Sequence, residues 1–317
     1  MSDIIGYLKQ YFKSHFHLGL YLSVALFLGC CIFLNFSFDL EKNYIRIYNK
    51  SFYKWLLMSL ETGFPFLVIC GLLYIFGVNK VWVKSKEFWI LFVFGFIIIG
   101  WQRSFFFHYS LLEDLNSVDR LFVRKVLWWV RPFITTFIPV VLFYNFYEKP
   151  RDASQSWYGL STKNTDFKPY IFLIIGVFVL MSIAATFSDL AVYYPLYERS
   201  GGRAFAEAHG FNEIFSVLLY EFVYGFNFLS IETFFRGFLV LGFIRVLGGH
   251  AVLAMVGSYV FLHFGKPISE CVSSAFGGYF IGILAFYSKR IWGGVALHVA
   301  LAWSMEFFAW LQKYFEN

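Results

Sequence analysis

The sequence predicts an all-α fold, a polytopic transmembrane bundle of about 8–10 membrane helices. Hydrophobic residues make up 59% of the 317-residue chain and charged residues only 15%. Soluble domains are about 45–50% apolar and about 25% charged. The mean hydropathy is +0.62. Apolar runs of about 20 residues, long enough to cross a bilayer as a helix, recur along the chain.

The chain begins with a short amphipathic segment. Apolar residues recur at helical spacing opposite Lys9 and Lys13, which indicates a helix lying in the membrane interface; they are Ile4, Ile5, Leu8, Tyr11 and Phe12. A polar lead-in to the first span is the alternative. The expected spans and helices cover residues 18–38, 55–77, 88–108, 126–146, 169–188, 211–247, 251–264, 271–287 and 291–312.

The stretch 211–247 is too long for one straight span. As a single helix it would be about 55 Å long, against a hydrocarbon core of about 30 Å. We therefore expect a kink or break between Gly225 and Ser230. Three regions follow: N-terminal transmembrane helices at 1–147, a linker, one span and an interfacial loop at 148–210, and a motif-bearing helical core at 211–317. The polar stretch 148–168 predicts an exposed linker.

Cysteines and net charge limit the classes of partner. Cys30, Cys31, Cys70 and Cys271 lie in or beside apolar stretches without metal-ligand spacing, so they predict buried thiols and neither a disulfide frame nor a zinc site. The net charge of +6 is spread over the loops. It favours contact with the lipid bilayer and gives no case for nucleic-acid binding.

Charged residues in the N-terminal half also lie near apolar spans. Glu61, Arg103 and Arg131 are expected to reach the interface by snorkelling. An ion pair between Glu61 and Arg131 across two helices is the alternative.

The residues that suggest chemistry begin at Glu232. Glu232 and Arg236 are four residues apart in an apolar, aromatic run, so on a helix they share a face and can pair. His263 and His298 lie on two further apolar helices, and Glu270 follows His263. A carboxylate and two imidazoles from separate helices can activate a water molecule and stabilise an oxyanion. A purely structural ion pair and structural histidines are the alternatives.

Small residues follow the first histidine and suggest packing without chemistry. A face that lets helices approach closely is expected from Ser273, Ser274, Gly277, Gly278 and Gly282.

These motifs resemble those of the CPBP family of intramembrane proteases, which includes the CAAX prenyl endopeptidases and bacterial abortive-infection or bacteriocin-immunity relatives. The family signature is E-E-x-x-x-R, then F-x-x-x-H, then H-x-x-x-N or -D. The matching stretch covers about residues 211–312. Glu232 and Arg236 match the second acid and the arginine, and His263 and His298 match the two histidines. Tyr259 stands in place of the phenylalanine.

Two positions depart from the family pattern. Ile231 occupies the place of the first acid, the proposed water-activating glutamate, and Ala302 replaces the Asn or Asp that assists the second histidine. Glu232, or Glu270 from the start of a helix, could act as the base instead. Glu221 is a poorer substitute, because on a straight helix it lies about 16 Å from Glu232.

A membrane-embedded endopeptidase is therefore expected from the resemblance. Glu232 and His263 would activate water, Arg236 would orient Glu232, and His298 would stabilise the oxyanion. Glu306, two turns past His298, is a weak further candidate. The substrate would be a peptide or a membrane-protein tail, and the resemblance implies neither a cofactor nor a metal. A zinc ion held by two histidines and a glutamate is the alternative.

Two other functions stay open. One is a catalytically impaired homologue that acts as a peptide-binding, immunity or scaffold protein, which Ile231 and Ala302 favour. The other is a transporter with Glu61, Arg131 and Glu221 along its pathway. In each case we expect an integral multi-pass protein of the bacterial cytoplasmic membrane.

Overall fold

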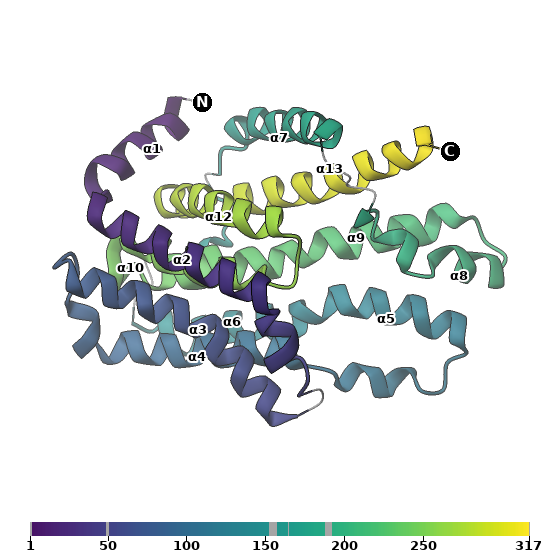
Figure 1. The fold of residues 1–317 in the computed structure, drawn as a ribbon, viewed down its shortest axis with the longest axis horizontal. Helices are drawn as coiled ribbons and strands as arrows, with labels where there is room; N and C mark the ends of the chain where they lie inside the picture. The colour runs from purple at the N-terminus through teal and green to yellow at the C-terminus, as the bar shows by residue number, and fades with distance from the viewer. Residues whose placement is uncertain (1, 49–50, 152–156, 164, 188–191, 317) are drawn as a thin grey trace. The chain divides into compact units, whose positions relative to one another are not determined.

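A computed structural model describes residues 2–48, 51–151, 157–163, 165–187 and 192–316, and every regular element within them is helical. Nine helices of these described residues are long and apolar enough to cross a membrane. They confirm the predicted all-α, multi-pass bundle, and Figure 1 follows them along the chain by colour. The spans begin and end close to the predicted residues in most cases.

Ten longer helices carry most of the described residues. They are α1 Ser2–His15, α2 Leu18–Phe38, α3 Phe52–Ile75, α4 Lys86–Ser104, α5 Ser117–Pro132, α7 Lys168–Phe187, α9 Glu213–Glu232, α11 Ala251–Leu262, α12 Ile268–Ser288 and α13 Trp292–Glu316. Three shorter α-helices are α6 Ile138–Phe143, α8 Gly202–Ala208 and α10 Ile244–Leu247. The π-helical segments are η1 Glu41–Ile45, η4 Phe133–Phe137, η5 Tyr144–Glu148 and η9 Thr233–Gly242. The 3₁₀ turns are η2 Val81–Lys84, η3 Phe107–Leu112, η6 Trp157–Gly159, η8 Tyr197–Arg199 and η10 Gly248–His250.

Two compact units divide the chain, and each draws on segments that are distant in sequence. Unit 1 combines Met1–Phe105, Thr135–Thr165 and Glu232–Trp292, and unit 2 combines Phe106–Ile134, Asp166–Ile231 and Gly293–Asn317. Each of the three regions expected from the sequence contributes residues to both units. The functional division into those three regions stays a prediction.

Close helix packing builds the core of unit 1. Helix α3 packs against α4 and α11, and α11 packs against α12. A Cβ atom at Gly278 would lie 2.8 Å from the Tyr259 ring, and one at Gly282 would lie 2.8 Å from Val252. Both glycines therefore let α12 approach α11, as expected from the small-residue face. Gly277 does not take part, since a Cβ there would meet no atom within 4 Å.

The tightest helix contact of unit 1 gives a prediction about stability. A Cβ at Gly100 of α4 would lie 2.0 Å from Ser59 Oγ and 2.7 Å from the Ser59 backbone nitrogen of α3. Gly100→Ala should lower the free energy of unfolding by about 1–3 kcal/mol, because the two backbones must separate. Gly71→Ala is the matched control, since a Cβ there meets no atom within 4 Å. Equal denaturation midpoints for the two variants would contradict the close approach.

The charged residues near the spans are covered by protein and do not reach the interface by snorkelling. Arg103 is only 9% exposed and donates to Glu61 at 2.5 Å and to Glu41 at 3.0 Å. Arg46 also pairs with Glu41, at 3.0 Å. Arg131 of unit 2 is buried, with its guanidinium 4.0 Å from the centre of the Trp128 ring. Snorkelling is therefore wrong for both arginines, because neighbouring protein groups cover them.

The predicted linker is wrong in part. Residues 152–156 and 164 lie outside the described residues, but the described Tyr158 is 1% exposed and packs against η9. A Cβ at Gly237 would lie 2.8 Å from the Tyr158 carbonyl oxygen. The Trp292 indole N–H donates to the Leu160 carbonyl at 2.8 Å. Tyr158 and Leu160 therefore anchor this part of the polar stretch in unit 1.

The expected kink or break between Gly225 and Ser230 is also wrong. Helix α9 continues as an α-helix through Gly225 and Ser230 to Glu232, and the helix type changes only at Thr233, where η9 begins. A Cβ at Gly225 would lie 2.9 Å from the Trp303 ring. The glycine allows α13 to approach α9 and does not break the helix.

The N-terminal helix is confirmed as α1, and its apolar face packs on the protein only in part, because Ile5 and Phe12 are exposed. Ile4 and Tyr11 are buried, whereas Lys9 and Lys13 are exposed. The Tyr11 hydroxyl donates to the Gly249 carbonyl at 2.9 Å. Its position in a membrane interface stays a prediction.

All four cysteines are free thiols. Cys70 and Cys271 are buried, as expected, but Cys30 is exposed and Cys31 is half-buried. The expectation of burial is wrong for Cys30, because it lies on a face of α2 that no other described helix covers.

Candidate functional site

The Glu232–Arg236 pair predicted from spacing is confirmed. Arg236 Nη1 donates to Glu232 Oε1 at 2.8 Å, and both side chains have 0% exposure. Glu232 is the last residue of α9, and Arg236 lies in the first turn of η9. Removing two charges from water is costly, and their mutual attraction offsets that cost only when the geometry is good. The two charges are therefore tied to each other inside unit 1.

Tyr259 connects this ion pair to the first histidine. The Arg236 guanidinium lies 4.4 Å from the centre of the Tyr259 ring. The centroids of the Tyr259 and His263 rings are 4.7 Å apart, and the ring planes are inclined at 67°. A continuous chain of contacts thus runs from Glu232 through Arg236 and Tyr259 to His263.

A backbone contact sets the tautomer of His263. Its Nδ1 lies 2.8 Å from the Tyr259 carbonyl oxygen. A carbonyl can only accept a hydrogen bond, so Nδ1 must carry the proton. In the neutral ring Nε2 is then the basic nitrogen, and it belongs to a half-buried side chain at the end of α11.

Glu270 takes part in a local ion pair. Its Oε2 lies 3.0 Å from Lys266 Nζ, and the residue is in the first turn of α12. A negative charge is stabilised at this end of a helix by the backbone dipoles. The Glu270 carboxylate, which the sequence suggested as an alternative base, is therefore engaged by Lys266.

The two departures from the family motif meet in one apolar cluster of unit 2. Ala302, Tyr224 and Phe228 are its buried members, and Ile231 packs against them with Val299, Trp129 and Leu196. His298 lies beside this cluster, with its ring 4.2 Å from the Phe228 ring. The positions at which the family carries an acid and an amide or second acid are thus occupied by hydrophobic packing.

The predicted site residues belong to different units. Glu232, Arg236, His263 and Glu270 lie in unit 1, and His298 lies in unit 2. Their convergence around one water molecule stays a prediction. Within the described residues, no three His, Cys, Asp or Glu side chains are grouped as a metal site requires.

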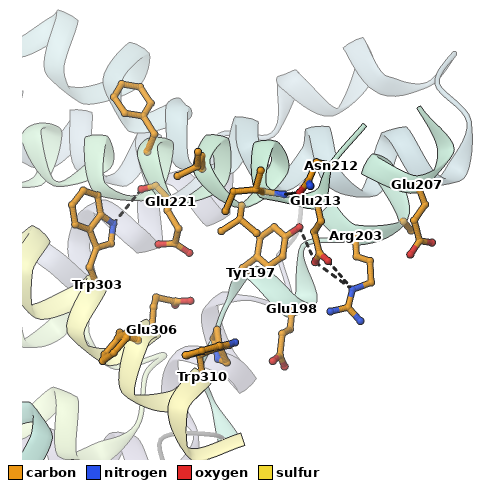
Figure 2. A pocket seen from close by; sticks show the side chains of 18 residues that line it. Tyr197, Glu198, Arg203, Glu207, Asn212, Glu213, Glu221, Trp303, Glu306 and Trp310 are labelled. Atoms are coloured by element: carbon orange, nitrogen blue, oxygen red, sulfur yellow. Dashed lines mark hydrogen bonds and ion pairs between the residues drawn. The ribbon is translucent and has the colours of Figure 1, made fainter. Parts of the chain in front are cut away.

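Unit 2 contains a pocket that the sequence did not reveal. Its volume is about 1370 Å³, and it is lined by residues of α8, α9, α13 and the segment that precedes α8. Figure 2 shows the carboxylates of Glu221 and Glu306 facing the same space from two helices. The Glu306 carboxylate accepts a hydrogen bond from the Leu196 backbone N–H, at 2.9 Å and 3.0 Å to its two oxygens. The only sequence signal was the presence of a glutamate in each of two apolar helices.

Polar contacts organise the outer end of this pocket. Arg203 Nε lies 3.1 Å from Glu213 Oε2, and the Tyr197 hydroxyl lies 2.8 Å from Ser216 Oγ and donates to Glu213 at 3.3 Å. Burial raises the pKa of the Tyr197 phenol, so it stays a hydrogen-bond donor near neutral pH. The Trp303 indole N–H donates to the Glu221 carbonyl at 3.2 Å, which holds α13 against α9.

Comparison with protein-family models gives no match, and comparisons with curated proteins and with solved structures give none either. The resemblance to the CPBP family therefore rests on the three short motifs.

Proposed function

We propose that this chain is a membrane protein of the CPBP type that binds a peptide segment of a membrane-associated partner without hydrolysing it by the family's glutamate mechanism. One observation carries the proposal: Ile231 and Ala302 belong to the same apolar cluster. Water activation needs a carboxylate or imidazole within hydrogen-bond reach of the water. Two of the positions that supply polar groups in the family supply hydrophobic contacts here.

The surroundings of Glu232 also support binding over hydrolysis. A general base must exchange protons with a water molecule. Glu232 has no exposed surface, and one of its oxygens accepts a hydrogen bond from Arg236. The Arg236 guanidinium compensates the carboxylate charge inside the protein. Glu232 is therefore better suited to neutralising Arg236 within the helix core.

Hydrolysis by Glu232 and His263, with His298 at the oxyanion, is the second candidate. The contact chain from Glu232 through Arg236 and Tyr259 to His263 favours it, because it links the two proposed groups. The Nδ1–H tautomer of His263 also leaves Nε2 as a base.

A count of newly formed peptide termini distinguishes peptide binding from hydrolysis. The purified chain in lipid nanodiscs is incubated with a membrane-protein extract, and new termini are counted by mass spectrometry. We expect the same termini for wild type, Glu232→Gln and His263→Ala, because no step of peptide binding needs a base. Glu113→Gln is the control for the change of charge, since Glu113 is exposed and far along the chain from the motifs.

Hydrolysis would give a different pattern. Removal of a general acid or base typically lowers a rate by about 10²–10⁴-fold. Wild-type termini that disappear in both Glu232→Gln and His263→Ala, while both variants stay folded and Glu113→Gln keeps them, would overturn the proposal and support the second candidate.

A further inference from the structure

The pocket of unit 2 is large enough to hold a ligand, and aromatic side chains line it. Its volume of about 1370 Å³ exceeds the roughly 300–1,000 Å³ of most small-molecule pockets. Phe222, Phe307, Trp303 and Trp310 contribute aromatic side chains to its walls, and all four keep large exposed surfaces. Aromatic faces bind both apolar chains and cations.

Acidic side chains dominate the charge of the lining. They are Glu198, Glu207, Glu213, Glu221 and Glu306, against the single cation Arg203. Arg203 forms an ion pair with Glu213, and Glu198 forms one with Lys313. These two ion pairs leave Glu207, Glu221 and Glu306 without a cationic partner in the lining, and Glu207 is exposed.

Among the described acids that line the pocket, Glu221 is distinguished by a buried carboxylate oxygen. Its Oε2 is a buried oxygen that accepts no hydrogen bond from any described residue. Figure 2 shows the carboxylate pointing into the pocket, toward the side occupied by Glu306. A buried acceptor normally has a partner. The geometry of the pocket therefore leaves a place for a donor that comes from outside the chain.

The position of Glu221 inside an apolar helix also supports an external donor. It lies eight residues after Glu213, where α9 begins, which is about 12 Å along the helix axis. Charged side chains inside membrane spans are costly and usually mark a functional pathway or binding site. A bound cation would offset one of the two carboxylate charges and supply the missing donor.

We propose that the pocket binds an organic cation with an apolar body, an ammonium or guanidinium group on a hydrocarbon or peptide chain. The cationic group binds Glu221 and Glu306, and the apolar body lies on the aromatic wall that includes Trp310. Because the pocket contains none of the motif residues Glu232, His263 and His298, its ligand can be tested independently of the proposed function.

Binding of decylammonium to the full chain in nanodiscs tests the charge requirement. Decanol has the same apolar body without the charge, and empty nanodiscs give the partition into lipid alone. We expect decylammonium to bind at least about tenfold more tightly than decanol, and Glu221→Gln and Glu306→Gln each to weaken it by about tenfold or more. Glu113→Gln, an exposed acid of unit 2 outside the pocket, should leave its Kd unchanged.

A second variant tests the aromatic wall separately from the charge. Trp310 is 50% exposed, so Trp310→Ala should fold normally. It should weaken decylammonium and decanol by similar factors. Its thermal midpoint, measured beside those of the glutamine variants, shows whether any loss of binding reflects unfolding.

The same assay with a short amphipathic peptide that contains one lysine, and with its Nε-acetylated form, identifies the source of the cation. Glu221-dependent binding of the lysine peptide alone supports a peptide ligand. Glu221-dependent binding of decylammonium supports a small amphipathic amine. Equal affinity for charged and uncharged probes, or a folded Glu221→Gln variant with wild-type affinity for every cation, would overturn the cation site.

Discussion

Replacing Arg236 with methionine should lower the free energy of unfolding by about 3–5 kcal/mol, because it leaves Glu232 as an uncompensated buried charge. Both side chains are wholly covered by protein, and Arg236 Nη1 donates to Glu232 at 2.8 Å. The guanidinium also lies against the Tyr259 ring, so the methionine loses that contact as well. Urea unfolding of the chain in detergent, followed by tryptophan fluorescence, measures the change.

The double variant Glu232→Leu with Arg236→Met separates the ion pair from the packing. Replacing both members of a buried pair by apolar residues is often neutral or stabilising. We therefore expect the double variant to regain most of the stability that Arg236→Met loses. Arg203→Met is the matched control, because the Arg203 side chain is 74% exposed and its pair with Glu213 should contribute less than about 1 kcal/mol. A loss at Arg236 no larger than the loss at Arg203 would contradict the buried pair.

Local pattern made this ion pair and the helical fold predictable. Most of the apolar runs are long enough to form a span by themselves, and the spacing of Glu232 and Arg236 places both on one helical face. Contacts within a few residues along a helix need no knowledge of the tertiary arrangement. The same logic anticipated the close packing at Gly278 and Gly282.

Contacts between distant segments were not predictable from the same reasoning. Arg103 meets Glu41 and Glu61, which lie 62 and 42 residues earlier in the chain. Nothing in the spacing of these residues marks them as partners, and Arg131 was an equally reasonable partner for Glu61. Only the packing of α4 beside α3 and η1 selects Arg103.

The glycine at 225 shows why one local signal can have two meanings. A glycine inside a helical run predicts either an interruption or a close contact. The length of the stretch favoured an interruption, but the contact with Trp303 accounts for Gly225. The pocket was missed for a related reason: Glu221 and Glu306 are 85 residues apart. From the sequence, Glu221 was a substitute base or a transporter residue and Glu306 a weak catalytic candidate, and nothing placed the two together.

Ala302→Asn should lower the free energy of unfolding by about 2–6 kcal/mol and should not create peptidase activity. The side chain is 1% exposed and lies among Tyr224, Phe228 and the partly buried Ile231. The larger asparagine overpacks this cluster, at about 1–3 kcal/mol. Its amide also loses water without gaining a partner, at about 1–3 kcal/mol more.

Ala302→Leu is the control that separates these two costs, because leucine resembles asparagine in shape but carries no polar atoms. We expect Ala302→Asn to be less stable than Ala302→Leu by the cost of the buried amide. An apolar cluster beside His298 offers the amide no hydrogen-bond partner, whereas a polar, hydrated site could hydrogen-bond it. If Ala302→Asn were as stable as Ala302→Leu and generated new peptide termini, the site beside His298 would have kept its polar character. Hydrolysis would then be the better account of this protein.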